Sequence, residues 1–243
     1  MLPPGITASA PSRPGATVFD QEWLSVAFLH WDVAPEAVAS LFPDGTWPDT
    51  LHGRTYVGLV AFRMARLGFG RGLPLPYLGR FPEINVRLYS VDEQGHHGVV
   101  FRSLEATRLL SVLGGRWGYQ IPYTWADMRI RQRGSEWTYQ SRRRMPLPAV
   151  STDIQIRVGD PITPSDEDIF VTARWGLHSR VANRTLWTPN EHPSWPLHAA
   201  ELVRLEDTLV PAAGVSVFGP PTLPVRWSPG VHTTFGLPQV VSR

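Results

Sequence analysis

The sequence predicts a single mostly β domain with a few short helices. Several segments alternate apolar side chains with a period of two, which is typical of strands, and residues 22–31 and 55–64 are the clearest examples. The 243 residues are 42% apolar and contain no internal repeat, low-complexity block or linker, so one core is expected. We expect residues 1–16, which include four prolines, to form a flexible arm and residues 17–243 to form the domain.

Strands dominate the first half of the chain. Residues 22–31 are apolar on both faces and predict a central strand, with Leu24, Val26, Phe28 and His30 on one face and Trp23, Ser25, Ala27, Leu29 and Trp31 on the other. Residues 32–41 predict a short helix that begins near Pro35. Residues 55–64 predict a second strand, residues 66–80 a long glycine-rich loop, and residues 81–91 and 98–102 a hairpin around the turn at 92–95.

The second half is harder to divide between strands and helices. Residues 103–113 follow a helical spacing that ends at a double glycine, and residues 126–133 and 136–143 predict a second hairpin. Extended segments are predicted at 154–158, 169–175, 215–218 and 231–235. Residues 199–209 fit two structures, because Leu202, Leu205 and Leu209 have helical spacing, whereas Val203 and Leu205 also fit a short strand. We favour the helix.

The composition excludes several kinds of chemistry. All 23 basic residues are arginines, so no lysine amine is available for a Schiff base, and the absence of cysteine excludes thiol nucleophiles. A net charge of +2 gives no basis for nucleic-acid binding. No membrane-spanning run or signal peptide is found, so we expect a cytoplasmic protein that binds no membrane. The eight histidines show no metal-ligand spacing, and no cofactor motif occurs, so we expect no metal and no cofactor.

Residues 114–128, GGRWGYQIPYTWADM, combine a double glycine, aromatic residues, an arginine and a proline-containing turn. Glycine allows close backbone approach and proline fixes the turn, so this stretch is more typical of a shaped pocket wall than of a spacer. Arg116, flanked by Trp117 and Tyr119, is the favoured residue for holding a carboxylate or phosphate, because its planar guanidinium can pair with two oxygens. The alternative is a solvated loop arginine.

A row of polar side chains follows one face of residues 81–89. The polar residues Glu83, Asn85, Arg87 and Tyr89 alternate with the apolar residues Ile84, Val86 and Leu88. The ordinary interpretation is a half-buried strand with its polar face in water. The alternative is a closed barrel with a polar interior that holds a ligand, in which Arg87 would bind an anion or neutralise Glu83.

The order of several motifs resembles a known family. FLHW, YVGLVAFRM, FPEINVRLY, GVVFRSLEA, GYQIPYTWADM and a late WPL are similar to the acetoacetate decarboxylase-like superfamily, in particular to its bacterial YqjF-like branch, which has no established activity. The resemblance spans residues 19–235 and implies a cone-shaped, mostly antiparallel β-barrel with an internal cavity. In the decarboxylase a glutamate and a lysine line that cavity. The position of the glutamate resembles Glu83, whereas the position of the lysine falls at or beside Tyr123, which cannot form an imine.

Two classes of function remain open. In the first, an enzyme acts on a carbonyl- or carboxylate-bearing small molecule as a lyase, isomerase or hydratase, with Glu83 as base and Tyr123 as acid or oxyanion donor. The expected substrate-binding residues are Arg116, Arg87, Tyr119, His30 and Trp117. In the second, the same barrel binds a ligand without chemistry. A homo-oligomer is compatible with both, and the sequence defines neither the substrate nor the role of residues 187–195.

Overall fold

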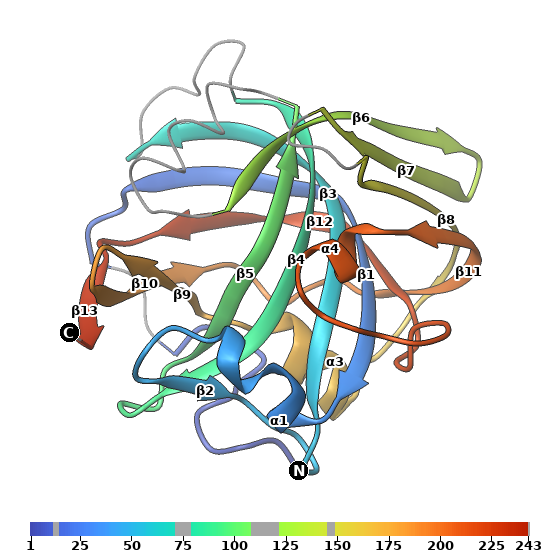
Figure 1. Cartoon of the computed structure of the whole chain (residues 1–243). Coiled ribbons are helices and arrows are strands. Elements are labelled where there is room, and N and C mark those ends of the chain that lie inside the picture. The colour runs from blue at the N-terminus through green and yellow to red at the C-terminus, as the bar shows by residue number, and fades with distance from the viewer. Residues whose placement is uncertain (12–14, 71–78, 108–121, 145–148, 243) are drawn as a thin grey trace.

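The structure is a computed structural model, and it describes residues 1–11, 15–70, 79–107, 122–144 and 149–242, with the side chains of Tyr123 and Ser242 excluded. The predicted mostly β fold is confirmed (Figure 1). The strands are β1 (Phe19–Val33), β2 (Thr46–Pro48), β3 (Thr55–Phe69), β4 (Phe81–Asp92), β5 (His97–Ala106), β6 (Tyr123–Arg133), β7 (Glu136–Arg143), β8 (Ser151–Pro161), β9 (Gly176–Val181), β10 (Arg184–Glu191), β11 (His198–Asp207), β12 (Arg226–Phe235) and β13 (Gln239–Ser242). The helices are α1 (Pro35–Val38), the 3-10 turn η1 (Ala39–Leu41), α3 (Asp166–Thr172) and α4 (Leu209–Ala212).

The strand pairings close into two rings that share one wall. In hydrogen-bonded order, the shared wall is β12, β1, β3, β4 and β5. The ring completed by β6, β7, β8 and β11, to the right of β5 in Figure 1, is called the apolar ring. The ring completed by β9 and β10, to the left of β5, is called the polar ring. The pairings are antiparallel except for β5 with β6 and β5 with β9, in agreement with the cone-shaped, mostly antiparallel barrel that was expected.

The apolar ring encloses the main hydrophobic core. One cluster of buried side chains joins Leu29 of β1, Val86 of β4, Tyr139 of β7 and Ile154 of β8 with Val210 of α4. Full burial of a side chain of this size stabilises the fold by about 1.5–3 kcal/mol. This cluster therefore fixes the shared wall, on whose other face the polar ring lies.

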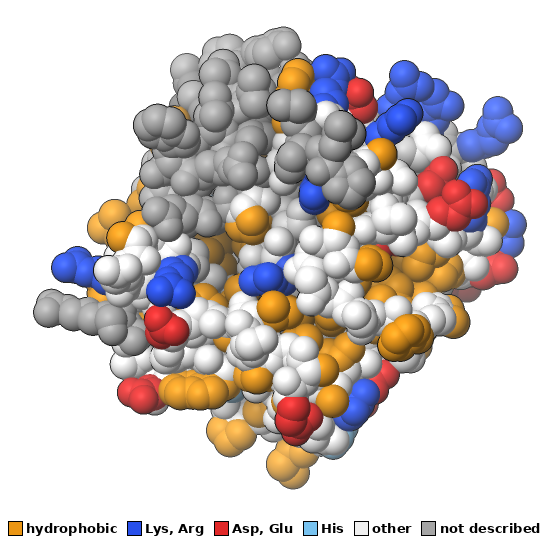
Figure 2. Space-filling view, in the orientation of Figure 1, with side chains coloured by type: hydrophobic (Ala, Val, Ile, Leu, Met, Phe, Trp, Pro, Cys, Tyr) orange, Lys and Arg blue, Asp and Glu red, His pale blue; other side chains and the backbone are white. Residues whose placement is uncertain are grey.

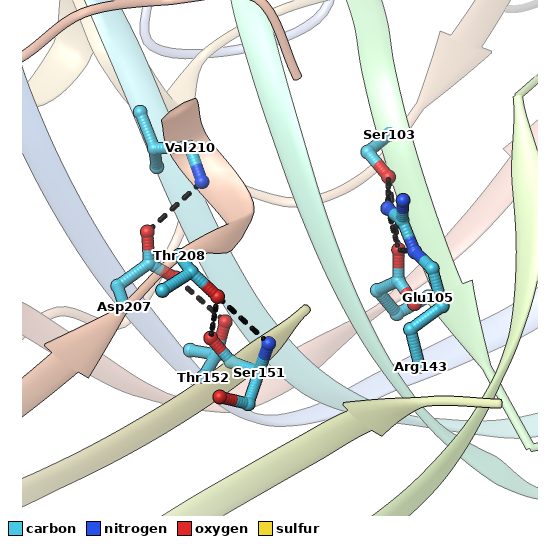
Figure 3. Close-up of polar contacts among 8 residues, drawn as sticks. All are labelled: Ser103, Glu105, Arg143, Ser151, Thr152, Asp207, Thr208 and Val210. Atoms are coloured by element: carbon cyan, nitrogen blue, oxygen red, sulfur yellow. Dashed lines mark hydrogen bonds and ion pairs between the residues drawn. The ribbon is translucent and has the colours of Figure 1, made fainter. Parts of the chain in front are cut away.

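Polar contacts tie the far wall of the apolar ring to its neighbours (Figure 3). Arg143 of β7 donates to the buried carboxylate of Glu105 on β5, with 2.6 Å between Nη2 and Oε1. On the opposite side, Thr152 of β8 and the backbone amide of Val210 both donate to the carboxylate of Asp207 at the end of β11. These contacts join strands that are far apart in the sequence, and they place α4 against the core.

The prediction of a helix at 199–209 is wrong, because residues 199–207 belong to β11 and only Leu209 is helical, as the first residue of α4. The register of β11 against β8 shifts between Leu202 and Arg204, so Val203 is an extra residue in the strand. This bulge places Leu202 opposite Ile156 and Leu205 opposite Ile154. A spacing of three residues, which suggested a helix, therefore brings two leucines to one face of a strand.

Two further segments differ from the prediction. The expected helix at 103–113 is wrong at its start, since β5 continues to Ala106; residues 108–113 lie outside the described part of the chain. The expected strand at 169–175 is wrong, because residues 166–172 form α3. Ser165 accepts a hydrogen bond from the Asp168 amide and Asp168 accepts one from the Ser165 amide, a capping box that begins the helix.

The faces of β1 change where the strand is irregular. Its register against β3 shifts between Leu24 and Ala27, and Ser25 has a φ of 54°. Beyond this bulge, Val26 and Phe28 face the polar ring as one group, and Trp23 rather than Leu24 packs with them. The prediction that Leu24 shares a face with Val26, Phe28 and His30 is therefore wrong for Leu24.

The first residues of the chain lie against the domain. Ile6 is buried in an apolar cluster that includes Leu51 and Phe170, and His97 contacts the carbonyl oxygen of Pro4 through Nε2 at 2.9 Å. The division of the chain at residue 16 stays a prediction. Across the residues that the structure describes, no helix is long and apolar enough to cross a membrane.

Candidate functional site

The polar row of β4 is buried. Ile84, Val86 and Leu88 belong to the core of the apolar ring, so the alternating side chains of Glu83 and Arg87 point to the other face of the sheet. Glu83 is 2% exposed and Arg87 is 9% exposed. The interpretation of a polar face in water is therefore wrong, and the row lines the interior of the polar ring instead.

Arg87 is a buried cation with unfilled hydrogen-bond donors. Its guanidinium carbon lies 5.8 Å from the ring centroids of both Phe28 and Tyr89. Its Nε and Nη2 atoms are buried and have no hydrogen-bond partner. One expected role of Arg87 was to neutralise Glu83. Among the described residues, no ion pair joins these two side chains. Buried charges are normally paired, so this guanidinium has the properties of an anion-binding group.

A hydrogen-bonded chain beside Arg87 defines the protonation of His30. Tyr89 donates its hydroxyl hydrogen to the carbonyl oxygen of Val171 at 3.0 Å, and His30 Nε2 lies 2.6 Å from the same hydroxyl. Because the tyrosine has only one hydrogen, His30 Nε2 must be the donor in the second bond. Burial, and to a lesser extent the charge of Arg87, lower the pKa of His30 well below its usual range. His30 is therefore a neutral imidazole whose Nδ1 can accept a proton or a hydrogen bond.

Aromatic rings form the opposite part of this interior. The indole of Trp195 stacks on Trp23 with a centroid distance of 6.0 Å, and it meets Phe28 edge-on at 5.1 Å. His192, just after β10, lies 5.2 Å from Trp195. Burial lowers the pKa of His192 to about 4, and the charge of Arg87 adds to the decrease. Neutral imidazoles and aromatic faces thus lie around Arg87, and a second buried cation, Arg174, packs 5.0 Å from the same Tyr89 ring and is paired with Asp49.

Further polar atoms on strands of the polar ring are buried without partners. They are Asn85 Oδ1 of β4, Thr188 Oγ1 and Asn190 Oδ1 of β10, Thr233 Oγ1 of β12 and Trp23 Nε1 of β1. Each such group costs free energy unless water or a ligand completes its hydrogen bonds. Three of these atoms lie on the shared wall and two on β10, and such a group of unfilled polar atoms is typical of a ligand-binding interior rather than of a core.

The structure brings together only some of the predicted site residues. Glu83, Arg87 and His30 belong to the polar ring, and Gly58 lies between His30 and Arg87 in a row across three strands. Tyr123 begins β6, and its backbone lies in register with Leu104 of β5, which in turn pairs with Asn85. The side chain of Tyr123 is not described, and Arg116, Trp117 and Tyr119 lie outside the described residues.

Sequence reasoning missed several residues of this interior. Asn85 belongs to the predicted polar row but had no role assigned, although the alternation of β4 could have indicated one. His192 and Trp195 lie at the end of a segment, 187–195, that had no predicted role. Among the described residues, no group of three or more histidine or acidic side chains could hold a metal ion.

Comparison with known proteins places the chain in a family. The profile of the DUF2071 family, described as an uncharacterised conserved protein, matches residues 20–233. The chain belongs to this family. A relative from Bacillus subtilis, the uncharacterised protein YqjF, is 30% identical over 206 residues, which are 84% of each chain. The predicted resemblance to the YqjF-like branch is confirmed.

Solved structures share the fold of this family member at low sequence identity. Acetoacetate decarboxylase from Legionella pneumophila is 12% identical, with a TM-score of 0.65 over 95% of this chain and 90% of the other. The enduracididine biosynthesis enzyme MppR, complexed with pyruvate, is 13% identical, with a TM-score of 0.61 over 96% and 93%. An acetoacetate decarboxylase-like enzyme from Sphingomonas wittichii RW1 is 8% identical, with a TM-score of 0.61 over 94% of both chains. At these identities the likeness shows the fold alone.

Proposed function

We propose that the protein binds a small carboxylate inside the polar ring and acts on an adjacent carbonyl group without a Schiff base. The observation that carries this proposal is the buried guanidinium of Arg87, whose Nε and Nη2 lack partners. Nε and a terminal nitrogen form the fork that pairs with both oxygens of a carboxylate. A carboxylate at this position would fill the donors and neutralise the charge, so Arg87 is the proposed carboxylate-binding residue.

The class of ligand is supported by the fold relatives. MppR is complexed with pyruvate, and acetoacetate decarboxylase is named for a keto acid. Both molecules combine a carboxylate with a carbonyl group. Since all basic residues of this chain are arginines, an imine between a side-chain amine and the carbonyl is excluded, and we propose that hydrogen bonding activates the carbonyl instead.

Glu83 and Tyr123 are the proposed acid–base pair. The carboxylate of Glu83 would remove a proton from the carbon next to the carbonyl, and the hydroxyl of Tyr123 would donate to the carbonyl oxygen as negative charge develops there. Glu83 is buried on the same strand face as Arg87. The reaction type would be that of a lyase, isomerase or hydratase. His30 is proposed to accept a hydrogen bond from the ligand at Nδ1, while Arg116, Trp117 and Tyr119 are proposed to complete the wall.

Calorimetric titration with pyruvate and acetoacetate tests the role of Arg87. Arg87→Met should lower the affinity about 10- to 100-fold, and Arg87→Lys should restore only part of it, because an ammonium cannot form the planar fork. Arg129→Met, on the exposed face of β6, is the matched control and should bind as the unmodified protein does. Unchanged affinity in Arg87→Met would contradict the proposed role of Arg87 and, with it, the proposed function.

A non-catalytic binding protein is the second candidate. The aromatic wall of Trp23, Phe28 and Trp195 favours it, since these rings contact a ligand without taking part in proton transfer. Exchange of the methyl protons of pyruvate with deuterated solvent, followed by proton NMR, separates the two candidates. An enzyme of the proposed type should accelerate the exchange, and Glu83→Gln should abolish the acceleration while pyruvate still binds. Binding without accelerated exchange would favour the second candidate.

A further inference from the structure

A notch opens where β5 passes from one ring to the other. The strand pairs with β9 at Val99 and with β6 from Leu104 onward. Between these two positions, residues 100–102 line a pocket of about 400 Å³, together with residues 40–43 and 177–180. Pockets for small ligands fall in the range of about 300–1,000 Å³. The notch is therefore large enough to admit a small organic acid.

A β-bulge turns one arginine toward this notch. Val86 of β4 lies opposite Ser103, and Arg87 lies opposite Phe101, so Arg102 is an extra residue in β5. Arg102 donates to the carbonyl oxygens of Leu41 at 3.2 Å and Ala213 at 3.4 Å, and it forms no ion pair with any described carboxylate. Its positive charge at the wall of the notch is thus not neutralised.

The β9 side of the notch carries a second arginine and an unfilled hydroxyl. The Arg180 side chain is 59% exposed, and Asp44, at 3.7 Å, is its weak and exposed partner. The neighbouring Ser179 hydroxyl is buried without a hydrogen-bond partner. Figure 2 shows basic side chains over β5 and β9 beside a hollow on this face. Two cations and a free donor at one opening form an electrostatic environment that attracts anions.

One side chain connects the notch to the interior site. Phe101 lines the notch and is only partly buried against the apolar cluster of Leu177 and Tyr89. In the register of β4 and β5 it is the direct neighbour of Arg87. Such cross-strand neighbours have Cβ atoms about 4.5–5.5 Å apart on one face of the sheet. Phe101 therefore belongs both to the lining of the notch and to the strand position next to Arg87.

We infer that the notch between β5 and β9 is the entrance through which a small carboxylate reaches Arg87. Arg102 and Arg180 attract the anion, and Phe101 is the side chain that it passes. The inference rests on the proposed function, because it requires Arg87 to hold the ligand. It adds a route and a set of residues that act on the rate of binding rather than on the bound state.

Fluorine NMR with trifluoroacetate as the probe tests the entrance, because line shapes give both the dissociation constant and the association rate constant. Arg180→Glu should lower the association rate constant about three- to ten-fold at low salt, and the difference should shrink at high salt. The control is Arg184→Glu, the same charge change on the exposed start of β10, outside the notch. Phe101→Trp, which narrows the passage, should slow association and dissociation to a similar degree.

The variants separate a failure of the entrance from a failure of the interior site. Equal association rates in Arg180→Glu and Arg184→Glu, with binding lost in Arg87→Met, would overturn the entrance and leave the interior site in place. Undiminished binding in Arg87→Met, or no binding to the unmodified protein, would contradict the proposed function and this inference with it. Slower association in Arg180→Glu but not in Arg184→Glu, together with loss of binding in Arg87→Met, supports both the entrance and the interior site.

Discussion

Gly58 lies beneath the hydrogen bond between His30 and Tyr89, and the absence of a side chain there makes that bond possible. A Cβ atom at this position would lie 2.9 Å from the Tyr89 hydroxyl and 3.0 Å from His30 Nε2. Gly58→Ala should therefore displace one of the two rings and destabilise the protein by about 1–3 kcal/mol. Urea unfolding, followed by tryptophan fluorescence, measures the change.

Gly159→Ala is the matched control for this change. Gly159 is also in a strand, β8, and the nearest atom to its added Cβ would be the Ala199 carbonyl oxygen at 3.6 Å, an ordinary contact. The substitution should alter the free energy of unfolding by no more than about 0.5 kcal/mol. If the two variants were equally stable, the close packing around Gly58 would not matter to the fold.

At single residues, the sequence was informative where side chains alternate and uninformative where they converge from separate segments. Glu83 and Arg87 were found because a polar row on a regular strand is visible in the sequence. Trp23 on β1 and His192, just after β10, reach the same interior from other segments, and no local spacing relates them to β4. The roles of Arg116 and Tyr123 stay predictions.

Among the secondary-structure elements, α3 depends on a cap that also serves the site. Ser165 accepts a hydrogen bond from the Asp168 amide, and the carbonyl oxygen of Val171, near the end of α3, accepts the hydrogen bond of Tyr89. Ser165→Ala should cost about 1 kcal/mol of stability and loosen the contact between α3 and Tyr89. Thermal unfolding gives the first effect, and hydrogen exchange of the α3 amides gives the second.

Ser135→Ala provides a comparison without a cap. Ser135 is exposed in the turn between β6 and β7. Its replacement should leave both the unfolding temperature and the exchange rates of α3 unchanged. Equal behaviour of the two alanine variants would mean that the capping box contributes nothing to α3.

Irregular strands explain two of the errors, the helix predicted at 199–209 and the face predicted for Leu24. A bulge inserts one residue into a strand, which converts the period of two into a local step of three. This occurs at Val203 in β11, at Arg102 in β5 and near Ser25 in β1. A step of three apolar positions is also what a helix produces, so β11 was given helical structure. Regular strands such as β4 and β7 were predicted at nearly their observed positions, whereas β3 continues to Phe69, so the predicted loop at 66–80 is wrong over residues 66–69.

For the whole molecule, the decisive fact is the double closure of the sheet. Alternation on β4 gives the same pattern whether the polar face meets water or a second ring, so the residues alone favoured water. Burial of that face follows from the pairings of β9 with β5 and of β10 with β12, contacts between distant segments. The family resemblance supplied what local spacing could not.

This buried polar interior should make the stability of the whole protein depend on pH. The pKa of His192 is lowered to about 4 in the folded protein, whereas an unfolded histidine titrates near 6.5. Between these values the unfolded chain binds a proton that the folded protein does not, so stability is fully present above pH ~6.5 and falls as the pH falls toward 4. For His192 the loss amounts to about 3 kcal/mol, and His30, whose pKa is also lowered, acts in the same direction.

His192→Phe keeps a ring but cannot take up a proton. It should therefore reduce the slope of the unfolding free energy against pH in this range, by an amount that corresponds to at most one bound proton. Urea unfolding at a series of pH values measures the slope, and His52→Asn, at an exposed position, is the control that should retain it. Buried carboxylates contribute equally to all three proteins, so the difference between the slopes isolates the imidazole. A slope in His192→Phe equal to that of the unmodified protein would show that His192 is not held neutral beside Arg87.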